Sequence, residues 1–176
     1  MWRIARSAMV GLLSLIFMAA CVKAKDPISA TVLGTYTTTI DGNSSLTKLI
    51  ERAGYKHVNK NITEDSFSMT LTKDIVQRKV HVVGLSMFAD YDEILGLLGQ
   101  KRLRLASISE LISLMQQHSG LQVGGEGVLV FSPTLKTWCG NRGVAVVKFG
   151  AKNRLSFGYY GYNYSNHYRL AAVPVT

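Results

Sequence analysis

The side chains best suited to chemistry gather in the carboxyl-terminal third of the chain. From Gly127 onward the sequence has basic residues but no aspartate or glutamate. The basic residues are Lys136, Arg142, Lys148, Lys152, Arg154 and Arg169, and among them lie Trp138, Phe157, Tyr159, Tyr160, Tyr162, Tyr164 and Tyr168. Ammonium and guanidinium groups attract anions, and aromatic rings can stack on sugar rings. This combination is typical of a surface that holds an anionic or glycan ligand.

A strand period of two divides the aromatic residues between two faces. In a strand over residues 154–164, Phe157 and Tyr159 fall on one face and the next three tyrosines fall on the other. We therefore predict a ligand-binding surface. Its candidate residues are Trp138, Arg154, Tyr160, Tyr162, Tyr164 and His167. The alternative is that the same rings pack across strands and stabilise the sheet without any ligand.

Sequence patterns of metal binding and of catalysis are missing. The histidines form no H-x-x-x-H pair and the cysteines no C-x-x-C pair, so we expect neither a metal site nor a cofactor. The hydrolase pattern G-x-S-x-G is absent, and residues 124–127 lack the lysine of a phosphate-binding loop. Asp90, Asp92 and Glu93 stand at an expected helix start, where carboxylates complement the helix dipole. We predict no catalytic residue. The alternative is an enzyme that acts on cell-wall glycan or peptide. Such an enzyme would need two carboxylates that the fold brings together from separate parts of the chain.

Cysteine use bears on the compartment. Only Cys21 and Cys139 are present. If Cys21 carries a lipid, Cys139 is unpaired. If Cys21 is unmodified, the two cysteines can form one disulfide in an oxidising compartment. A catalytic Cys139 would need a lowered pKa and a nearby base, and no adjacent residue supplies that base.

Residues 1–20 have the layout of a secretory signal peptide. Arg3 and Arg6 precede an apolar run that is shorter than the about 20 residues of a membrane span. The run ends in Met-Ala-Ala-Cys, which resembles the lipobox of bacterial lipoproteins, and this resemblance implies a lipid on Cys21. Val22 in place of aspartate implies, by likeness to the sorting of such proteins, the outer membrane more than the inner one. The alternative is ordinary cleavage to a periplasmic or secreted protein.

Charge is unevenly distributed along the chain. The sequence has 20 basic and 11 acidic residues, and removing Arg3 and Arg6 with the signal peptide leaves a net charge of +7. Basic and acidic residues balance over residues 21–99, whereas beyond them the acidic residues are Glu110 and Glu126. This field favours an anionic envelope component such as a phosphate-rich glycan or lipid headgroups, and we expect no nucleic-acid partner. Alternatively, the basic residues only keep a tyrosine-rich surface soluble.

The element expected at the centre of the fold is a strand followed by a capped helix over residues 102–115. Polar and apolar residues alternate over residues 102–105, as in a half-buried strand. Ser107 then stands three residues before Glu110, which is the spacing of a capping box. Helical spacing places Ile108, Leu111, Ile112 and Met115 on one apolar stripe. We expect this unit to lie in the core.

The other elements predict an α+β protein with two or three short helices packed on a mainly antiparallel sheet. One helix should begin after Ser45 and end at Gly54, and another should begin after Asp90 and end at Gly99. Strands are expected at 31–40, 79–85, 128–132, 143–149, 154–164 and 168–173. Short connections between the last four favour an antiparallel meander or sheet. The predicted organisation is a signal peptide (1–20), a tether (21–30) and a single domain (31–176).

One stretch resembles a family of uncharacterised bacterial proteins. The segment AGYKHVNKNITEDSF, which ends at Phe67, is similar to a family opening of the form Y-x-x-V-N-x-x-I-T followed by an aromatic residue. The likeness continues with RLRLASISELI at residues 102–112, Gln122, and RLAAV at residues 169–173. The chain departs from the family at Leu105, where the family has proline, and in its penultimate strand, which is rich in glycine and tyrosine.

No activity is attached to this family, so the resemblance implies the extent of the domain and the order of its elements. That order also resembles C-type-lectin-like domains. Together, the sequence predicts a lipid-anchored protein of the bacterial envelope with a non-catalytic binding or structural role, and an envelope enzyme is the alternative.

Overall fold

The computed structural model describes residues 26–67, 69, 74–121, 124–137, 139–148, 154–161 and 167–175. In these residues the chain forms three helices packed on a mostly antiparallel sheet, which confirms the α+β class. A C-type-lectin-like arrangement is not confirmed. The elements in chain order are β1 (Ala30–Asp41), α1 (Leu46–Arg52), β2 (His57–Val58), β3 (Ile75–Leu85), α2 (Tyr91–Gln100), β4 (Leu103–Leu105), α3 (Ile108–Gln117), β5 (Gly127–Lys136), β6 (Arg142–Lys148), β7 (Arg154–Tyr159) and β8 (Tyr168–Pro174).

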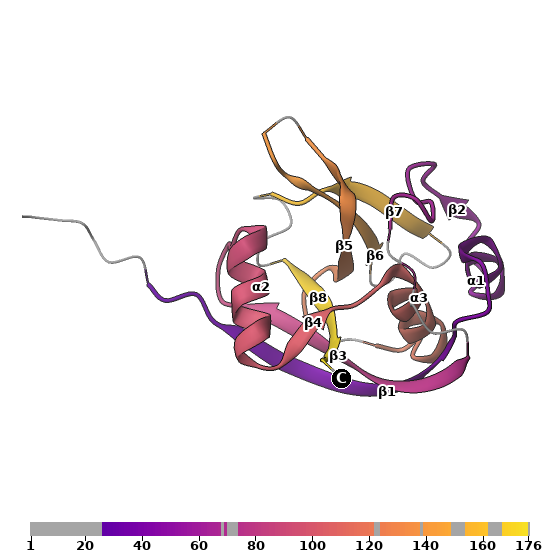
Figure 1. The fold of residues 1–176 in the computed structure, drawn as a ribbon, viewed down its shortest axis with the longest axis horizontal. Coiled ribbons are helices and arrows are strands. Elements are labelled where there is room, and N and C mark those ends of the chain that lie inside the picture. Colours follow the sequence, from indigo (N-terminus) through magenta and orange to yellow (C-terminus); the bar gives the residue numbers. More distant parts are fainter. Residues whose placement is uncertain are drawn as a thin grey trace, which may run out of the picture.

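The strand that comes last in the sequence lies in the middle of the sheet. The order is β1-β3-β8-β5-β6-β7-β2, and β4 also pairs with β8. β5, β6 and β7 form the expected antiparallel meander. β8 does not extend it, because it pairs antiparallel with β3 and parallel with β5 (Figure 1). Of the expected alternatives, a meander or another antiparallel sheet, the meander holds for β5 to β7 and is wrong for β8, which joins the two halves of the sheet.

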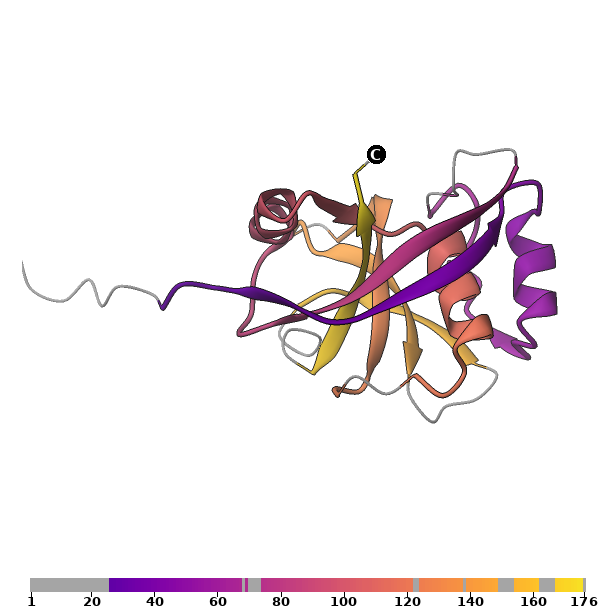
Figure 2. The same cartoon turned by 90° about the horizontal axis from the view of Figure 1, so that it is seen from below.

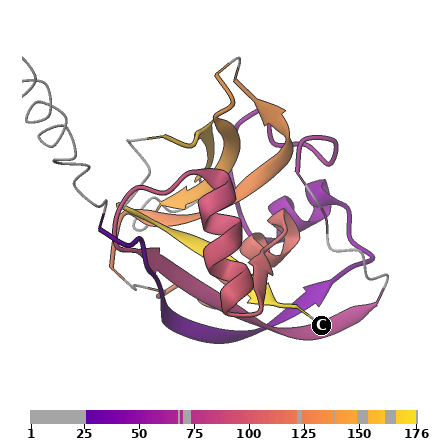
Figure 3. The ribbon, with the colours of Figure 1, turned by 60° about the vertical axis from the view of Figure 1, so that its left-hand side comes forward.

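The central strands are apolar at successive positions because both of their faces are covered. The runs Val-Leu-Val-Phe of β5, Val-Ala-Val-Val of β6 and Leu-Ala-Ala-Val of β8 are buried throughout. Alternate residues in a strand point to opposite faces, so such a run indicates a strand without a solvent-facing side. In Figure 2, α1 and α3 lie together at one end of the molecule, and in Figure 3 α2 lies in front of β8.

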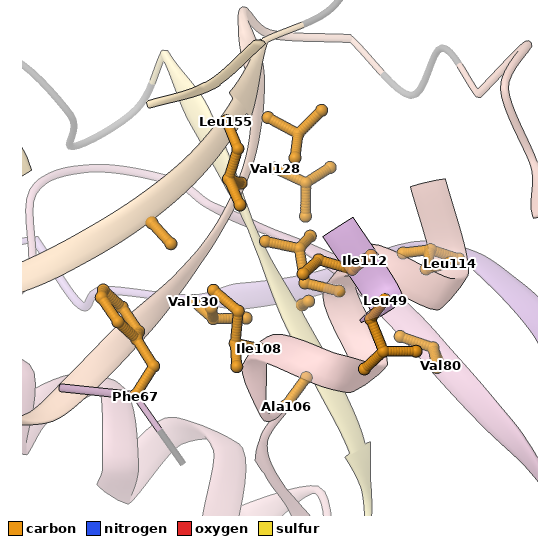
Figure 4. Packing of buried hydrophobic residues seen from close by; sticks show 14 of the residues in the cluster. Leu49, Phe67, Val80, Ala106, Ile108, Ile112, Leu114, Val128, Val130 and Leu155 are labelled. Atoms are coloured by element: carbon orange, nitrogen blue, oxygen red, sulfur yellow. The ribbon is translucent and has the colours of Figure 1, made fainter. Parts of the chain in front are cut away.

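Two apolar cores result, one on each face. The α3-side core packs Ile108, Leu111 and Ile112 of α3 against Val128 and Val130 of β5 (Figure 4). The α2-side core packs helix α2 against the opposite face of the same strands. Its members include Ile94, Leu98, Leu129, Phe131, Val144, Val146 and Leu170. The neighbouring residues 128 and 129 thus belong to different cores, as the strand period requires.

Both predicted capping boxes are confirmed. The Ser107 hydroxyl accepts from the Glu110 N–H at 3.2 Å, and the Glu110 carboxylate accepts from the Ser107 N–H at 2.7 Å. Asp90 and Glu93 make the equivalent pair of bonds at the start of α2. Most of α3 from Ile108 to Leu114 is buried, so this helix lies in the core as expected, although Met115 is only partly buried.

Some expected boundaries are wrong. Helix α2 runs past Gly99 to Gln100, and the chain turns at Arg102, whose φ is 55°. The N–H groups of Lys101 and Arg102 donate to the carbonyls of Leu98 and Gly99 and close the helix, so the left-handed residue is Arg102 and not the predicted Gly99. Strand β7 ends at Tyr159, short of the predicted residue 164.

Candidate functional site: a basic row across the sheet

Tyr160 was a predicted ligand-binding residue, and the structure places it in the α2-side core. It is 5% exposed, and its ring packs against Phe131 at 4.9 Å and Phe88 at 5.9 Å between ring centroids. Its hydroxyl has no hydrogen-bond partner among the described residues. Tyr160 is therefore not an exposed platform for a sugar. The alternative of aromatic packing within the sheet holds at this position.

Arg154 and His167 are the other predicted site residues that the structure describes, and both are exposed. Trp138, Tyr162 and Tyr164 lie outside the described residues, as does the predicted lipid-bearing Cys21. The predicted split of the aromatic rings is visible at two positions. Phe157 packs against the α3-side core, whereas Tyr160 belongs to the α2-side core.

Strand register places Arg154 in a line with basic side chains from two neighbouring strands. On one side, His57 of β2 is the parallel partner of Arg154. On the other side, β6 and β7 pair Val146 with Ser156, and continuing this antiparallel register by two residues sets Lys148 opposite Arg154. Residues paired across neighbouring strands point to the same face. We call Lys148, Arg154 and His57, from β6, β7 and β2, the basic row.

The basic row is exposed and continues inward toward a buried tyrosine. All three of its residues are exposed. Next to Lys148 in the register stands Gly127 of β5, and next to Gly127 stands Tyr168 of β8. Because Gly127 has no side chain, the Lys148 ammonium reaches over it and lies 5.8 Å from the centre of the Tyr168 ring. This cation–π contact fixes the inner end of the row.

A single acidic residue stands near this inner end within the described part of the chain. Burial raises the pKa of Tyr168, a hydrogen bond with Lys148 lowers it, and a hydrogen bond with Glu126 raises it again. Tyr168 therefore shares hydrogen bonds with both Lys148 and Glu126. Arg154 and His57 lie farther out, at the β7–β2 end of the row, where the Arg154 guanidinium carries the main attraction for an anion.

Uncharged polar side chains come next along the same face. Two residues beyond Arg154 stands Ser156, which is partly buried and whose hydroxyl has no hydrogen-bond partner among the described residues. Two residues beyond His57 stands Asn59, whose N–H donates to the carbonyl of Leu155 at 3.2 Å. The chain thus keeps its pairing with β7 past the end of β2. The basic row is bordered by a second row that offers neutral hydrogen-bonding groups.

Part of this site was visible in the sequence and part was not. Arg154 was predicted from the clustering of basic residues, and Lys148 belonged to that cluster. His57 was missed, because it joins the row through the parallel pairing of a two-residue strand. The other basic residue of β6, Arg142, serves the fold: it lies 4.3 Å from the ring centre of Tyr91 and donates to the carbonyl of Pro133.

Two hollows elsewhere could be considered as sites. A pocket of about 310 Å³ between α2 and residues 26–28 has Asp26 and Glu93 in its wall. The Glu93 carboxylate accepts a hydrogen bond from the Asp90 N–H at 2.8 Å and thereby serves the capping box of α2. A hollow of about 270 Å³ beside α1 and α3 includes Asp41 and Arg52, which bind each other at 3.0 Å.

Cysteine and histidine side chains are dispersed. Cys139 is exposed in the turn between β5 and β6, where a hydrogen bond with Thr137 lowers the pKa of its thiol. His81 bonds the Thr35 hydroxyl, and His118 packs against the ring of Tyr36. No group of three metal-binding side chains occurs within the described ranges. Of the helices that the structure describes, none combines the length and the apolar character that crossing a membrane requires.

Comparison with known proteins adds no assignment to this geometry. No protein-family model matches the chain, and no curated protein or solved structure matches it either.

Proposed function

We propose that this protein binds an anionic component of the bacterial cell envelope through the basic row, without catalysis, while a lipid on Cys21 holds it at the membrane. One observation carries the proposal. The register of β6, β7 and β2 aligns Lys148, Arg154 and His57 on one exposed face. These strands belong to a half of the chain whose excess of basic over acidic residues supplies the net charge of the mature protein.

Binding is favoured over catalysis by the surroundings of the row. Its groups are exposed, and the acidic neighbour Glu126 stands at the far end beside Tyr168. A general acid or base acts best with a pKa that its surroundings have moved toward the working pH. The exposed Arg154 guanidinium and Lys148 ammonium instead suit reversible attraction of an anion.

A charge-reversal pair tests the proposal. The full mature chain with Cys21→Ser would be assayed for binding to lipopolysaccharide, peptidoglycan and a neutral polysaccharide at low and high salt. Arg154→Glu should weaken binding to the anionic glycans at least about tenfold at low salt, since it turns an attraction into a repulsion. Salt should reduce the difference, because charges are screened over about 8 Å at physiological ionic strength.

Lys136→Glu is the matched control. Lys136 is exposed and pairs with Arg142 at one end of the β5–β6 pair, whereas Lys148 of the basic row stands at the other end. Lys136→Glu changes the net charge of the protein by the same amount as Arg154→Glu. If both variants lose the same affinity, the protein binds through net charge alone and the row is not the site. If neither the parent nor any variant binds an anionic glycan, the proposed function is wrong.

The lipid anchor is tested separately. Cys21→Ser should abolish labelling of the protein with radioactive palmitate and release it from the membrane fraction, because acyl chains on this residue would supply the attachment. Labelling and fractionation that do not change in this variant would contradict lipidation at Cys21.

A further inference from the structure

We infer that the basic row holds the phosphate of a phosphorylated sugar, with the sugar ring lying along β7 toward Ser156. This inference rests on the proposed function and specifies its ligand. It follows from two rows of side chains with different chemistry, an exposed one and a partly buried one, set side by side on one face of the sheet.

The first row suits a single phosphate group. Neighbouring strands lie about 4.8 Å apart, so Lys148, Arg154 and His57 start within a width of about 10 Å. A terminal phosphate offers three acceptor oxygens to such converging donors, one more than a carboxylate. The planar guanidinium of Arg154 can bind two of these oxygens at once, and the Lys148 ammonium adds a point charge.

The second row suits a neutral polyhydroxyl group. Two residues along a strand cover about 6.6 Å, so Ser156 and Asn59 lie one sugar ring away from the cations. The Ser156 hydroxyl forms no hydrogen bond within the described residues, and it can both donate and accept. The side-chain Oδ1 of Asn59 accepts from the Asn61 N–H at 3.0 Å, which leaves the two N–H groups of the same side chain as donors. Sugar hydroxyls need both kinds of partner.

The position of the tether selects a glycan over the headgroups of the anchoring membrane. Asp26 follows Cys21 by five residues, a segment that spans at most about 17 Å. In Figure 1 the described chain begins on the α2 side of the molecule, whereas β7 and β2 lie on the opposite side. A protein anchored through Cys21 would therefore present the basic row away from its own membrane.

Titration calorimetry on the full mature chain with Cys21→Ser tests the inference. The probes are N-acetylglucosamine 1-phosphate, inorganic phosphate, unphosphorylated N-acetylglucosamine, and vesicles of an anionic phospholipid. The sugar phosphate should bind at least about tenfold more tightly than inorganic phosphate, because the second row adds hydrogen bonds. The unphosphorylated sugar and the vesicles should bind more weakly than the sugar phosphate.

Substitutions separate the two rows. Ser156→Ala should lower the affinity for the sugar phosphate about fivefold, as expected for one net hydrogen bond, and leave inorganic phosphate binding unchanged. Arg154→Lys should weaken both phosphate probes, because it keeps the charge and loses the two-oxygen contact. Ser119→Ala, at an exposed serine after α3, is the control, and circular dichroism checks that each variant folds.

The outcomes distinguish this inference from the proposed function. If the sugar phosphate binds no better than inorganic phosphate and Ser156→Ala has no effect, the sugar subsite is wrong and the anion site stands. Preference for the vesicles would replace the glycan by a lipid headgroup. If none of the phosphate probes binds but polysaccharide binding still depends on Arg154, the row takes another anion. Loss of all binding would overturn both proposals.

Discussion

Glu110 is the most consequential single residue of the fold, because a fully buried carboxylate must have all its partners in place. Its oxygens accept from Arg104 at 2.8 and 3.0 Å, and Arg78 approaches to 3.8 Å. The same carboxylate closes the capping box with Ser107. A glutamate with no exposed surface is rare unless it is paired in this way.

The two capping boxes allow the effect of burial to be measured directly. Glu110→Gln should lower the free energy of unfolding by about 2 to 3 kcal/mol, since it removes a charge that two arginines and a backbone N–H depend on. Glu93→Gln, in the partly exposed box of α2, should cost less than about 1 kcal/mol. Denaturant unfolding of both variants provides the comparison. Equal losses would contradict the role given to the arginines.

Tyr160 makes stability sensitive to alkaline pH. Burial, with smaller contributions from the nearby carboxylates of Asp90 and Glu93, raises its pKa from 10.0 to about 12. Between these values the unfolded chain has lost the phenolic proton while the folded chain retains it. Stability from this group is therefore complete below pH about 10 and falls as the pH rises toward about 12.

Tyr160→Phe should remove this sensitivity without harming the fold. The hydroxyl has no partner within the described residues, so the free energy of unfolding near neutral pH should stay the same or rise slightly. Above pH about 10 the variant should lose less stability than the parent. The measurement is denaturant unfolding across this range. Identical losses would assign the effect to another phenol, such as Tyr55, whose pKa burial also raises to about 12.

At the scale of elements, Gly127 shows how the sheet makes room for the basic row. A Cβ at this position would stand 2.4 Å from the carbonyl oxygen of Val147 and 2.8 Å from the Cα of Lys148. Both neighbours are backbone atoms, which cannot move without disturbing the pairing of β5 with β6. The same bare position lets Lys148 reach Tyr168.

Two glycine substitutions should therefore have opposite effects. Gly127→Ala should destabilise the protein by about 1 to 3 kcal/mol, the usual range for forcing atoms into a packed site. Gly96→Ala, on α2 in open space, should stabilise it by about 0.5 to 1 kcal/mol, because alanine loses less conformational freedom in a helix. Thermal melts of both variants give the comparison. A neutral Gly127→Ala would mean that β5 and β6 separate more easily than their register implies.

Helices and strands that are specified by neighbouring residues in the sequence were predictable. The strands with which they pair in the sheet were not. The spacing of Ser107 and Glu110 is enough to start a helix, because both hydrogen bonds are made within one turn. The place of β8 depends on pairing with β3, which is distant in the sequence. For the same reason Arg154 could be identified as a candidate and His57 could not. Tyr160 was wrongly predicted to be exposed. The alternation of side chains along a strand assigns a residue to one face of the sheet but does not show whether other elements cover that face.

At the scale of the whole molecule, the two halves of the chain differ in net charge and in the elements that they contribute. The first half is electrically balanced and supplies β1, α1, β3 and α2, whereas the second half carries the positive charge and most of the central sheet. The halves are not separate domains, because β8 from the second half pairs with β3 from the first, and β2 from the first pairs with β7 from the second.

The central position of β8 also governs when the protein can fold. As the ribosome makes the chain from its amino terminus, β3 and β5 are complete before the strand that joins them exists. Until then their facing edges have no partner in the sheet, and the two apolar cores lack one of the strands that they share. The nascent chain should therefore remain open, and accessible to chaperones, until synthesis has passed Pro174.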